Sequence, residues 1–548
     1  MTAGRKSGEG GRRRNVVMQT AFAVCLMFVA ACRQKTQEAP MVLFNEDGTH
    51  YFDWIEARHP GKDFTRADLV SYCERFQRGA VTHYLVNVSG MTGFYDSQAL
   101  EWNARIHERM GTCGLSKGRP EHDRRIAVER QLAKDGLDPY AVFIDEARKR
   151  GIVPWLSMRM NDIHNVIEED NCSTAVFWKE HPEYRLDPKE PAGKKNRNWG
   201  RGLPFDYAHA AVRQRHLNGL REMLERYDVD GIELDWMRHS MVFRPGHERE
   251  DAHFLTDFMR EARMIVDAEG RARGRRLQVA ARIASRPEAS RALGFDFEAW
   301  AREGLIDVLI ACNDFLTVDG GLSAREWKPL LAAANPRVRF VAGMDLGLAP
   351  ECSWDVRRNL TLEEQTGWIE RHLADGADGL YFFNYHYLEP DQPAAVHLLT
   401  KDWTLAHFAA LPRDYVVTMC DAAPVQDLKD KQFGPVGAQR RDVKVQCGRR
   451  PTSGEVAVTL AFSQLPRPST TDSLRLNGQP PVSVSPGDPN AFTGDAKNRK
   501  GKAVVRAVFP CAAMRDGENV VSVLGDGRPD GVLHACRIEV RPGMTETK

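Results

Sequence analysis

The 548-residue sequence contains little cysteine and almost no net charge. Its 11 cysteines are too few for the dense disulfide scaffold of a small secreted domain. With 76 Lys and Arg against 75 Asp and Glu, the formal charge is +1, which disfavours a nucleic-acid partner because such proteins usually carry a basic excess. The composition, 42% hydrophobic and 28% charged, is globular, and the length predicts at least two domains.

Several motifs of nucleotide, metal and serine enzymes are also missing. The sequence has no glycine-rich dinucleotide fingerprint after its first predicted strand, no phosphate-cradling loop and no Gly-x-Ser-x-Gly elbow. Its 17 histidines include no His-Glu-x-x-His helix. Asp162 and His164 lie near one another without an evident third ligand. We therefore expect no cofactor, and a catalytic metal is the main alternative chemistry.

The one apolar run of membrane-spanning character lies at the N-terminus. A basic head precedes the run Val16–Ala31, which ends in Val29-Ala30-Ala31-Cys32 before polar residues. This order is typical of an export signal, and its end resembles the bacterial lipobox, in which the cysteine is acylated. We expect a signal peptide over 1–31, lipidation of Cys32, a tether over 32–46 and a place in the cell envelope, on the periplasmic face or the outer surface. An ordinary signal peptide or an uncleaved anchor is the alternative.

The middle of the chain, 47–412, alternates apolar strands with polar helices. This pattern predicts a (β/α)8 TIM barrel in an α/β fold. Helical patterns include His209–Tyr227, Glu248–Glu269 and Leu362–Asp375. The third strand is weak, and without it a doubly wound sheet would be favoured. The expected strands are Thr82–Val88, Ile152–Met158, Leu203–Tyr207, Asp230–Trp236, Leu277–Ile283, Ile306–Asn313, Val338–Gly343 and Gly379–Asn384.

Short β-rich runs replace the helices after Pro412 and predict a small β-sandwich over 413–548. Such a domain would serve as a brace or as a sugar-binding module, and both alternatives stay open. In an exported protein its four cysteines would suit two disulfides, with Cys73–Cys113 as a further pair. The expected strands are Tyr415–Thr418, Val456–Phe462, Ala503–Phe509, Asn519–Val523 and Arg537–Val540, and the four cysteines are Cys420, Cys447, Cys511 and Cys536.

The most informative stretch is the predicted fourth strand. Because alternate side chains of a strand face opposite ways, Ile232 and Leu234 would pack outward and leave Glu233 and Asp235 inside the barrel. Two enclosed acids are costly unless they are paired, protonated or open to a site. Asp235 ends its strand, where barrel enzymes keep their catalytic groups. The structural alternative pairs Glu233 with an arginine and has Asp235 cap the next loop.

The sequence Asp-Gly-Ile-Glu-Leu-Asp-Trp-Met-Arg at 230–238 resembles the glycosyl-hydrolase-like barrel proteins of bacteria, distant relatives of α-amylase and α-galactosidase barrels. The resemblance extends over Tyr84–Tyr387 and implies Asp235 as nucleophile. An acid/base after the sixth strand would be Asp314. The α-amylase pattern needs a fifth-strand glutamate, but Arg282 stands near that place.

Glycoside hydrolysis needs a proton donor and a carboxylate that attacks or activates water. Asp235 with Asp314 is the first predicted pair, Asp345 is the reserve acid, and Glu233 is a further candidate. Glu351 and Asp162 are weaker. Aromatic faces for a sugar would come from Trp236, Tyr385, Trp155 and Tyr95. Polar contacts would come from Arg159, Asn161, His164, Arg238, His239, Arg282, Asn313, Asn384 and His386.

These observations predict an exported lipoprotein that hydrolyses glycosidic bonds of a poly- or oligosaccharide. Its partners would be the carbohydrate and, through the lipid anchor, a membrane. The alternative is a non-catalytic carbohydrate-binding lipoprotein on a degenerate hydrolase barrel. The sugar, linkage and anomeric outcome stay open.

Overall fold

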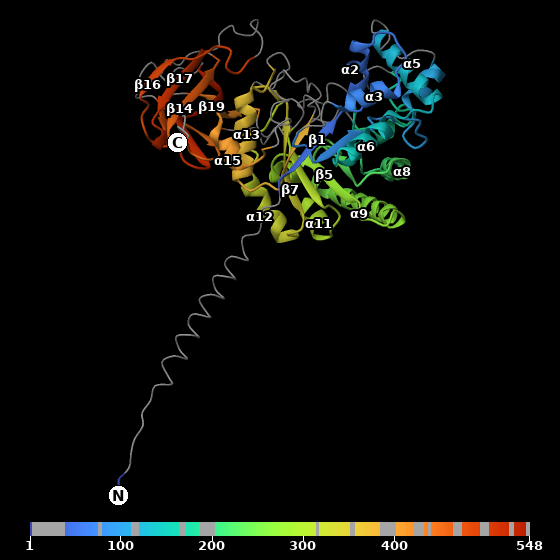
Figure 1. Cartoon of the computed structure of the whole chain (residues 1–548), viewed down its shortest axis with the longest axis horizontal. Helices are drawn as coiled ribbons and strands as arrows, with labels where there is room; N and C mark the ends of the chain where they lie inside the picture. Colours follow the sequence, from blue (N-terminus) through green and yellow to red (C-terminus); the bar gives the residue numbers. More distant parts are fainter. Residues whose placement is uncertain are drawn as a thin grey trace. The chain divides into compact units, whose positions relative to one another are not determined.

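The computed structural model describes most of the chain after residue 38 and is summarised in Figure 1. It divides into two units, Met1–Pro40 and Met41–Lys548. Over the described part, no helix combines the length and apolarity needed to cross a membrane. The described residues are 1–2, 39–74, 79–110, 120–163, 171–186, 203–313, 317–350, 357–383, 402–420, 432–436, 440–463, 474–493, 503–524 and 531–543.

A closed barrel of parallel strands forms the first part of the larger unit and confirms the predicted fold class. Its strands follow the order β1-β10-β7-β6-β5-β4-β3-β2 around the barrel. The strands are β1 (Met41–Glu46), β2 (His83–Asn87), β3 (Val153–Arg159), β4 (Gly231–Asp235), β5 (Gln278–Ala284), β6 (Val308–Cys312), β7 (Arg339–Asp345) and β10 (Gly379–Phe383). A small β8 (Gly347–Leu348) and β9 (Arg358–Asn359) pair antiparallel after β7.

The first strand corrects the predicted boundary and the predicted third strand. Met41–Glu46 pairs with β10 on one side and β2 on the other, so the barrel begins inside the segment 32–46 that we expected to be a tether. Leu203–Tyr207 forms no strand and makes only the isolated bridge Arg185↔Phe205. The eighth place in the closed barrel is taken by β1, between β10 and β2, so Leu203–Tyr207 is left in the segment that leads into α8.

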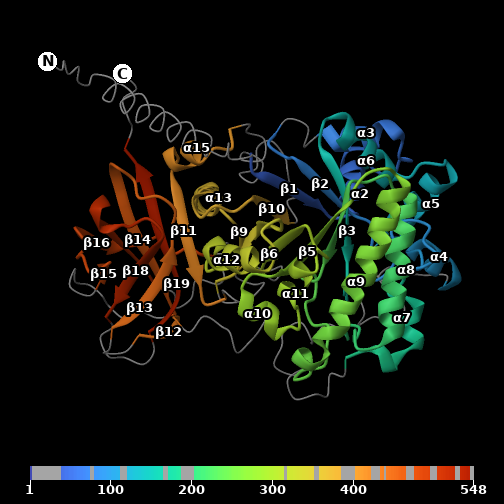
Figure 2. The same ribbon diagram turned by 90° about the horizontal axis from the view of Figure 1, so that it is seen from below.

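Helices surround the barrel, and α8, α9 and α13 match the predicted patterns closely. α8 and α9 lie side by side on the outer face (Figure 2). The N-cap Thr361 and Glu364 form a reciprocal capping box that starts α13. The helices are α2 (His50–Arg58), α3 (Arg66–Cys73), α4 (Asn103–Met110), α5 (Pro120–Lys134), α6 (Pro139–Lys149), α7 (Val176–Glu180), α8 (Ala210–Arg226), α9 (Glu248–Ala272), α10 (Pro287–Ala292), α11 (Phe297–Arg302), α12 (Ala324–Ala334), α13 (Leu362–Ala374) and α15 (Leu405–Ala410).

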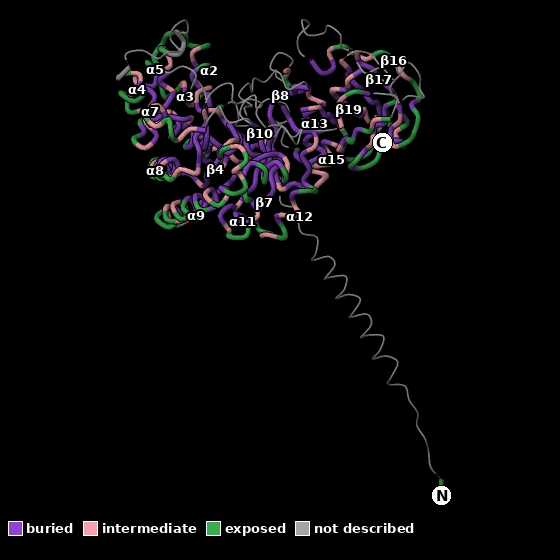
Figure 3. Tube along the Cα trace, turned by 180° about the vertical axis from the view of Figure 1, so that it is seen from behind, coloured by how far each residue is buried: buried purple, intermediate pink, exposed green. Residues whose placement is uncertain are grey.

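Alternation along the strands separates two hydrophobic cores. Side chains such as Ile232 and Leu234 belong to the large core between strands and helices. Leu43, Trp155 and Tyr381 belong to a smaller core inside the barrel. The barrel strands consist almost entirely of buried residues (Figure 3), as expected of a parallel sheet covered by helices. The middle of the interior is therefore packed largely by apolar side chains, and polar side chains lie toward both ends of the strands.

Two antiparallel sheets follow the barrel and confirm the predicted sandwich. One sheet has the order β11-β19-β14-β17-β16 with β12 beside β19, and the other has the order β13-β18-β15. They share a core of their own. The strands are β11 (Arg413–Thr418), β12 (Gly434–Pro435), β13 (Arg441–Gln446), β14 (Gly454–Phe462), β15 (Leu474–Leu476), β16 (Ser483–Pro486), β17 (Ala503–Phe509), β18 (Glu518–Val523) and β19 (Val532–Pro542).

The sandwich packs against α13 through buried polar contacts. The Tyr415 hydroxyl donates to Glu370 Oε2 at 2.6 Å, and the Arg449 N–H donates to Glu370 Oε1 at 2.9 Å. Glu364 of the same helix pairs with Arg358 at 2.6 Å and with Arg537 of β19 at 3.6 Å. Both glutamates are buried, so α13 is enclosed between the barrel and the sandwich.

The cysteines do not form the expected bridges. Cys447, Cys511 and Cys536 are free thiols in the sandwich, and Cys73 is a free buried thiol. Two bridges among the four sandwich cysteines, and the pair Cys73–Cys113, are therefore wrong. Cys172 and Cys420 each take part in a disulfide bond.

Candidate active site

Charged side chains from neighbouring strands meet at the C-terminal end of the barrel. The register aligns Arg159 of β3 with Asp235 of β4, and Asp235 with Arg282 of β5. All three side chains are buried. The predicted inward orientation of Glu233 and Asp235 is confirmed, because both make their polar contacts with residues of other strands.

Asp235 is held through one of its two oxygens. Its Oδ1 accepts from Arg282 Nη1 at 2.8 Å and from the Met237 backbone N–H at 2.9 Å. Its Oδ2 is buried and has no hydrogen-bond donor among the described residues. A fixed carboxylate with one uncommitted oxygen is the arrangement that a reacting group requires.

Arg282 fills the space beside Asp235 and has no exposed surface. Its guanidinium lies 3.8 Å from the centre of the Phe383 ring, at cation–π distance. Its Nη2 donates to Cys312 Sγ at 3.5 Å. Burial raises the pKa of Cys312 to about 11, so its thiol stays protonated at neutral pH.

Glu233 lies one layer deeper in the barrel than Asp235. Burial, followed by the nearby charge of Asp235, raises the pKa of Glu233 to about 7. Asn45 of β1 donates its amide to Glu233 Oε2 at 3.0 Å. The hydroxyls of Ser157 and Tyr381 also act on this carboxyl and oppose the increase in pKa. Glu233 is therefore a proton-holding acid near neutral pH.

Asp345 ends β7 and is anchored like Asp235. Its Oδ1 accepts from the Gly347 N–H and from Arg357 Nη2, each at 3.1 Å. Its Oδ2 is buried without a hydrogen-bond donor in the described part of the chain. Burial raises the pKa of Asp345 to about 6, against the opposing effect of Arg357. Arg282 also lowers this pKa, which places Asp345 within electrostatic range of the Asp235–Arg282 pair.

A second charged network adjoins the first and includes a residue that sequence reasoning missed. Arg159 donates to Asp47 Oδ2 at 2.6 Å and to Asp162 Oδ2 at 3.1 Å. Although burial raises it, the pKa of Asp47 is held far below its usual range by Arg159 and His50. Asp47 follows the apolar run of β1, so recognising that strand would have identified it.

Several predicted contact residues have structural roles instead. Trp236 has no exposed surface and packs outward against Tyr207, Phe258 and Phe295, so its ring is no sugar-stacking face. Asn161 bonds to the backbone of Phe205 and Met241 through both ends of its amide, which fixes two loops. Trp155 is fully buried inside the barrel, edge-on to His83. Tyr95 lies away from the cluster, against Tyr227 and Arg226.

Other predicted residues are at the strand ends or outside the described part. Arg238 is buried near the Phe383 ring, and His239 Nδ1 lies 3.4 Å from the Ile163 N–H. Asn313 donates to the Thr317 carbonyl, while its buried Oδ1 has no partner among the described residues. The residues outside the described part are Cys32, His164, Asp314, Glu351, Asn384, Tyr385 and His386.

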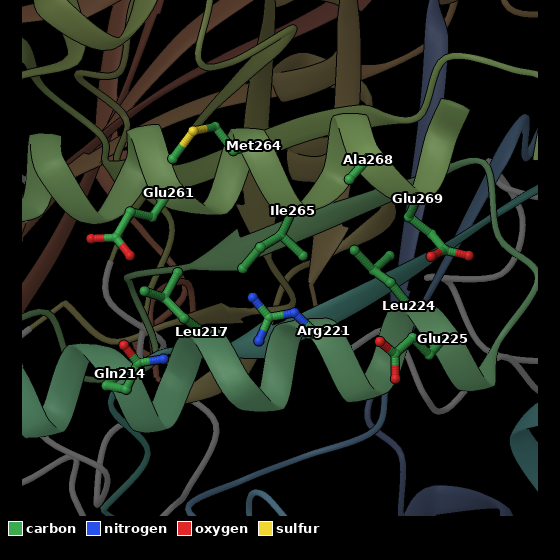
Figure 4. Close-up of a pocket in the computed structure, with 10 residues that line it drawn as sticks. All are labelled: Gln214, Leu217, Arg221, Leu224, Glu225, Glu261, Met264, Ile265, Ala268 and Glu269. Atoms are coloured by element: carbon green, nitrogen blue, oxygen red, sulfur yellow. The ribbon is translucent and has the colours of Figure 1, made fainter. Parts of the chain in front are cut away.

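Two further features of the described residues bear on the chemistry. They contain no cluster of three or more His, Cys, Asp or Glu side chains suited to a metal ion. A groove of about 380 Å³ lies on the outer face between α8 and α9, with Leu217, Leu224 and Ile265 between the two helices (Figure 4). Its lining comes only from these helices and includes none of the strand-end carboxylates, so it is not the candidate active site.

No family model and no curated protein matches the chain. Solved structures that resemble it include an α-L-fucosidase from Paenibacillus thiaminolyticus, with 14% identity and a TM-score of 0.39 over 68% of this chain and 49% of that chain. An α-galactosidase from Geobacillus stearothermophilus has 10% identity and a TM-score of 0.36 over 92% and 56%. A Paenibacillus chitinase has 9% identity and a TM-score of 0.38 over 92% and 56%.

The chain thus spans about half the length of these glycoside hydrolases. Identities and TM-scores this low carry no functional argument. The barrel itself is established by the pairing of its eight parallel strands.

Proposed function

We propose that the barrel hydrolyses O-glycosidic bonds, with Asp235 and Asp345 as its catalytic pair. One observation carries the proposal: each carboxyl group is anchored through Oδ1, and each has a buried Oδ2 without a donor among the described residues. Burying a polar oxygen without a partner is costly. Two such oxygens at the C-terminal ends of barrel strands are best explained as groups that meet a substrate.

The two carboxyl groups lie in different electrostatic environments, as glycoside hydrolysis requires. Asp235 is ion-paired with a fully buried arginine and is the nucleophile. Asp345, with its pKa raised to about 6, is the proton donor. Its partner Arg357 is half-buried, which leaves this acid on the more open side of the cluster. Glu233 is one layer deeper, and the charge of Asp235 helps to raise its pKa to about 7.

In the first step Asp345 gives its proton to the glycosidic oxygen as the bond from that oxygen to the anomeric carbon breaks. The Asp235 carboxylate forms the new bond to that carbon. In the second step the Asp345 carboxylate takes a proton from water, and the water oxygen displaces Asp235. The products are two hydroxyl-terminated sugars, and both side chains return to their starting charge.

The cellular part of the proposal comes from the N-terminal sequence. A basic head, an apolar run and Ala30-Ala31-Cys32 support export and acylation of Cys32. Mass spectrometry of the mature N-terminus tests this, with Cys32→Ala as the matched variant. A mature protein that retains residues 1–31, or an unmodified Cys32, would contradict it.

The decisive experiment is hydrolysis of a panel of poly- and oligosaccharides. We expect turnover by the wild type and a loss of at least a hundredfold in Asp235→Asn and Asp345→Asn. Asp228→Asn is the matched control, because Asp228 is an exposed acid outside the cluster. Binding without turnover by the wild type would favour the non-catalytic carbohydrate-binding alternative. Undiminished turnover in either active-site variant would remove that residue from the mechanism.

A further inference from the structure

The segment that follows β7 carries two adjacent arginines with different partners. Arg357 donates to the Oδ1 of Asp345 at 3.1 Å. Arg358 donates to both carboxylate oxygens of Glu364, on α13, at 2.7 and 2.6 Å. One arginine therefore holds the proposed proton donor, and the next residue along the chain ties the same segment to α13.

Arg358 also contacts the β-sandwich. Its Nη2 donates to the backbone carbonyl of Ala491 at 2.9 Å, in the segment between β16 and β17. Arg537 of β19 donates to the same carbonyl at 3.1 Å and lies 3.6 Å from Glu364. Ala491 and Phe492 belong to the large core of the barrel and not to the core of the sandwich. This part of the sandwich is therefore packed into the barrel beside Arg358.

The contact between Arg358 and Glu364 is ionic and shielded from water. The side chain of Glu364 has no exposed surface, and that of Arg358 is 10% exposed. Although burial raises it, the pKa of Glu364 is held below its usual range by Arg358 and Arg537, so the carboxylate is charged at neutral pH. A bidentate pair between an arginine and a carboxylate fixes the directions of both side chains as well as stabilising them.

The backbone pairing within the segment after β7 is short. β8 and β9 pair over two residues each, with Leu348 opposite Arg358. A two-stranded ladder of this length is at most marginally stable alone. We therefore expect the conformation of the segment, and with it the direction of Arg357, to depend on what holds Arg358.

The Arg357 guanidinium lies against the backbone of Gly347. A Cβ atom at this glycine would overlap the guanidinium. The same glycine donates its N–H to Asp345 Oδ1 at 3.1 Å. Arg357 thus occupies a closely bounded place beside Asp345, and a small displacement of its segment changes the distance between the two charged groups.

The charged and titratable groups that act on Asp345 come from three elements. Arg357 comes from its own segment, Arg282 from β5 and the Cys312 thiol from β6. Burial raises the pKa of Asp345 to about 6, and Arg357 opposes burial more strongly than Arg282 does. Arg282 and Cys312 lie on barrel strands, whereas the segment of Arg357 is held from outside the barrel. Asp345 is therefore sensitive to how firmly that segment is held.

We propose that Arg358 is a positioning residue of the active site, through which the β-sandwich holds Arg357 against the proton donor Asp345. The inference rests on the proposed function in taking Asp345 as that donor. It gives the sandwich a role beyond bracing, because a domain after the barrel then controls a catalytic carboxyl group. Without Arg358, Arg357 moves away from Asp345, and the pKa of Asp345 rises.

The test follows the Asp345 carboxyl group directly in the full chain. NMR of protein with isotopically labelled aspartate carboxyl groups gives their titrations, and Asp345→Asn identifies the Asp345 resonance. We expect Arg358→Gln to raise the titration midpoint of Asp345 by about half a pH unit or more. The alkaline limb of kcat/KM should move to higher pH with it. In the same variant kcat should fall about tenfold, with KM changed by less than about twofold.

The sandwich side of the contact offers a matched pair of variants. Arg537→Gln removes the contacts with Glu364 and with the Ala491 carbonyl and should move the Asp345 midpoint in the same direction. Arg506→Gln is the control, because Arg506 lies in the same sheet and also pairs with Glu539 at 3.1 Å. It should leave the Asp345 midpoint unchanged. Circular dichroism verifies that each variant is folded.

An unchanged Asp345 titration in folded Arg358→Gln overturns the inference. A shift of equal size in Arg506→Gln also overturns it, because the effect would then be a general loosening of the sandwich. A shift that Arg537→Gln does not share removes the sandwich from the relationship and overturns the inference as stated. Arg358→Lys keeps the charge without the bidentate geometry and should give a smaller shift than Arg358→Gln.

If Arg358→Gln does not fold, Arg358→Lys and Arg537→Gln decide, and an unmoved titration in both overturns the inference. The NMR measurement does not depend on hydrolysis. The expected shifts in a chain that hydrolyses no glycan would support the positioning role and contradict only the proposed function. Turnover by the wild type together with an unmoved titration in the variants would contradict only the positioning role.

Discussion

The carboxylate of Asp235 and the guanidinium of Arg282 form a salt bridge of 2.8 Å in which neither side chain is more than 1% exposed. The two residues stand side by side in the register of β4 and β5. An ion pair so deeply buried has a large desolvation cost, and removing one partner leaves the other charge uncompensated.

We therefore expect Arg282→Met to lower the free energy of unfolding by about 3–5 kcal/mol. Urea denaturation followed by fluorescence measures this loss. The double variant Arg282→Met with Asp235→Asn should recover part of it, because no unpaired charge then remains. A loss below about 1 kcal/mol in the single variant would show that the pair is not buried as described.

Glu233 predicts a specific pH dependence of stability. Its pKa is raised from the ordinary 4.5 to about 7 in the folded chain, so between these values the folded state binds more protons than the unfolded state. The free energy of unfolding must then fall by on the order of 3 kcal/mol as the pH rises from about 4.5 to 7. Glu233→Gln lacks this contribution, and the difference between the two unfolding profiles measures it. Parallel profiles would contradict the assignment.

Asp345 predicts a pH dependence of activity. As the proton donor with a pKa of about 6, it makes kcat/KM fall as the pH rises above that value. Arg357 lowers this pKa, so Arg357→Gln should move the alkaline limb to higher pH. Arg339→Gln, at the opposite end of β7, is the control. An alkaline limb that stays in place would exclude Asp345 as the donor.

The contact between Tyr415 and Glu370 predicts that the sandwich braces the barrel. Tyr415→Phe removes the hydroxyl that donates to Glu370 at 2.6 Å and should cost about 2 kcal/mol, as for hydrogen bonds to charged groups. Lys444→Ala, at an exposed position, should change stability by less than about 0.5 kcal/mol. We expect one cooperative thermal transition for barrel and sandwich together. Two separate transitions by calorimetry would favour an independent sugar-binding module.

The sequence was sufficient to predict most of the barrel, because β4 to β7 are apolar runs between polar helices. It did not reveal β1, since Met41–Phe44 is only four apolar residues and its partners β2 and β10 lie far along the chain. A strand this short is stabilised by its neighbours rather than by its own composition, so local patterning identifies it poorly.

The site was predictable to the extent that it depends on alternation within one strand. That rule placed Glu233 and Asp235 inside the barrel, and applied to the next residue it also sends Trp236 outward. Which arginine meets which acid depends instead on the register between strands: the sequence suggested an arginine as a partner for Glu233, whereas Arg282 pairs with Asp235. Asn161 acts through two loops, whose conformations no periodicity encodes.

The position of β1 also determines at which face of the barrel the first strand begins. Met41 stands at the N-terminal end of its strand, and in a parallel barrel all such ends share the face opposite Asp235 and Asp345. The covalent link to the segment before Met41 is therefore made at the face of the barrel opposite these two carboxyl groups.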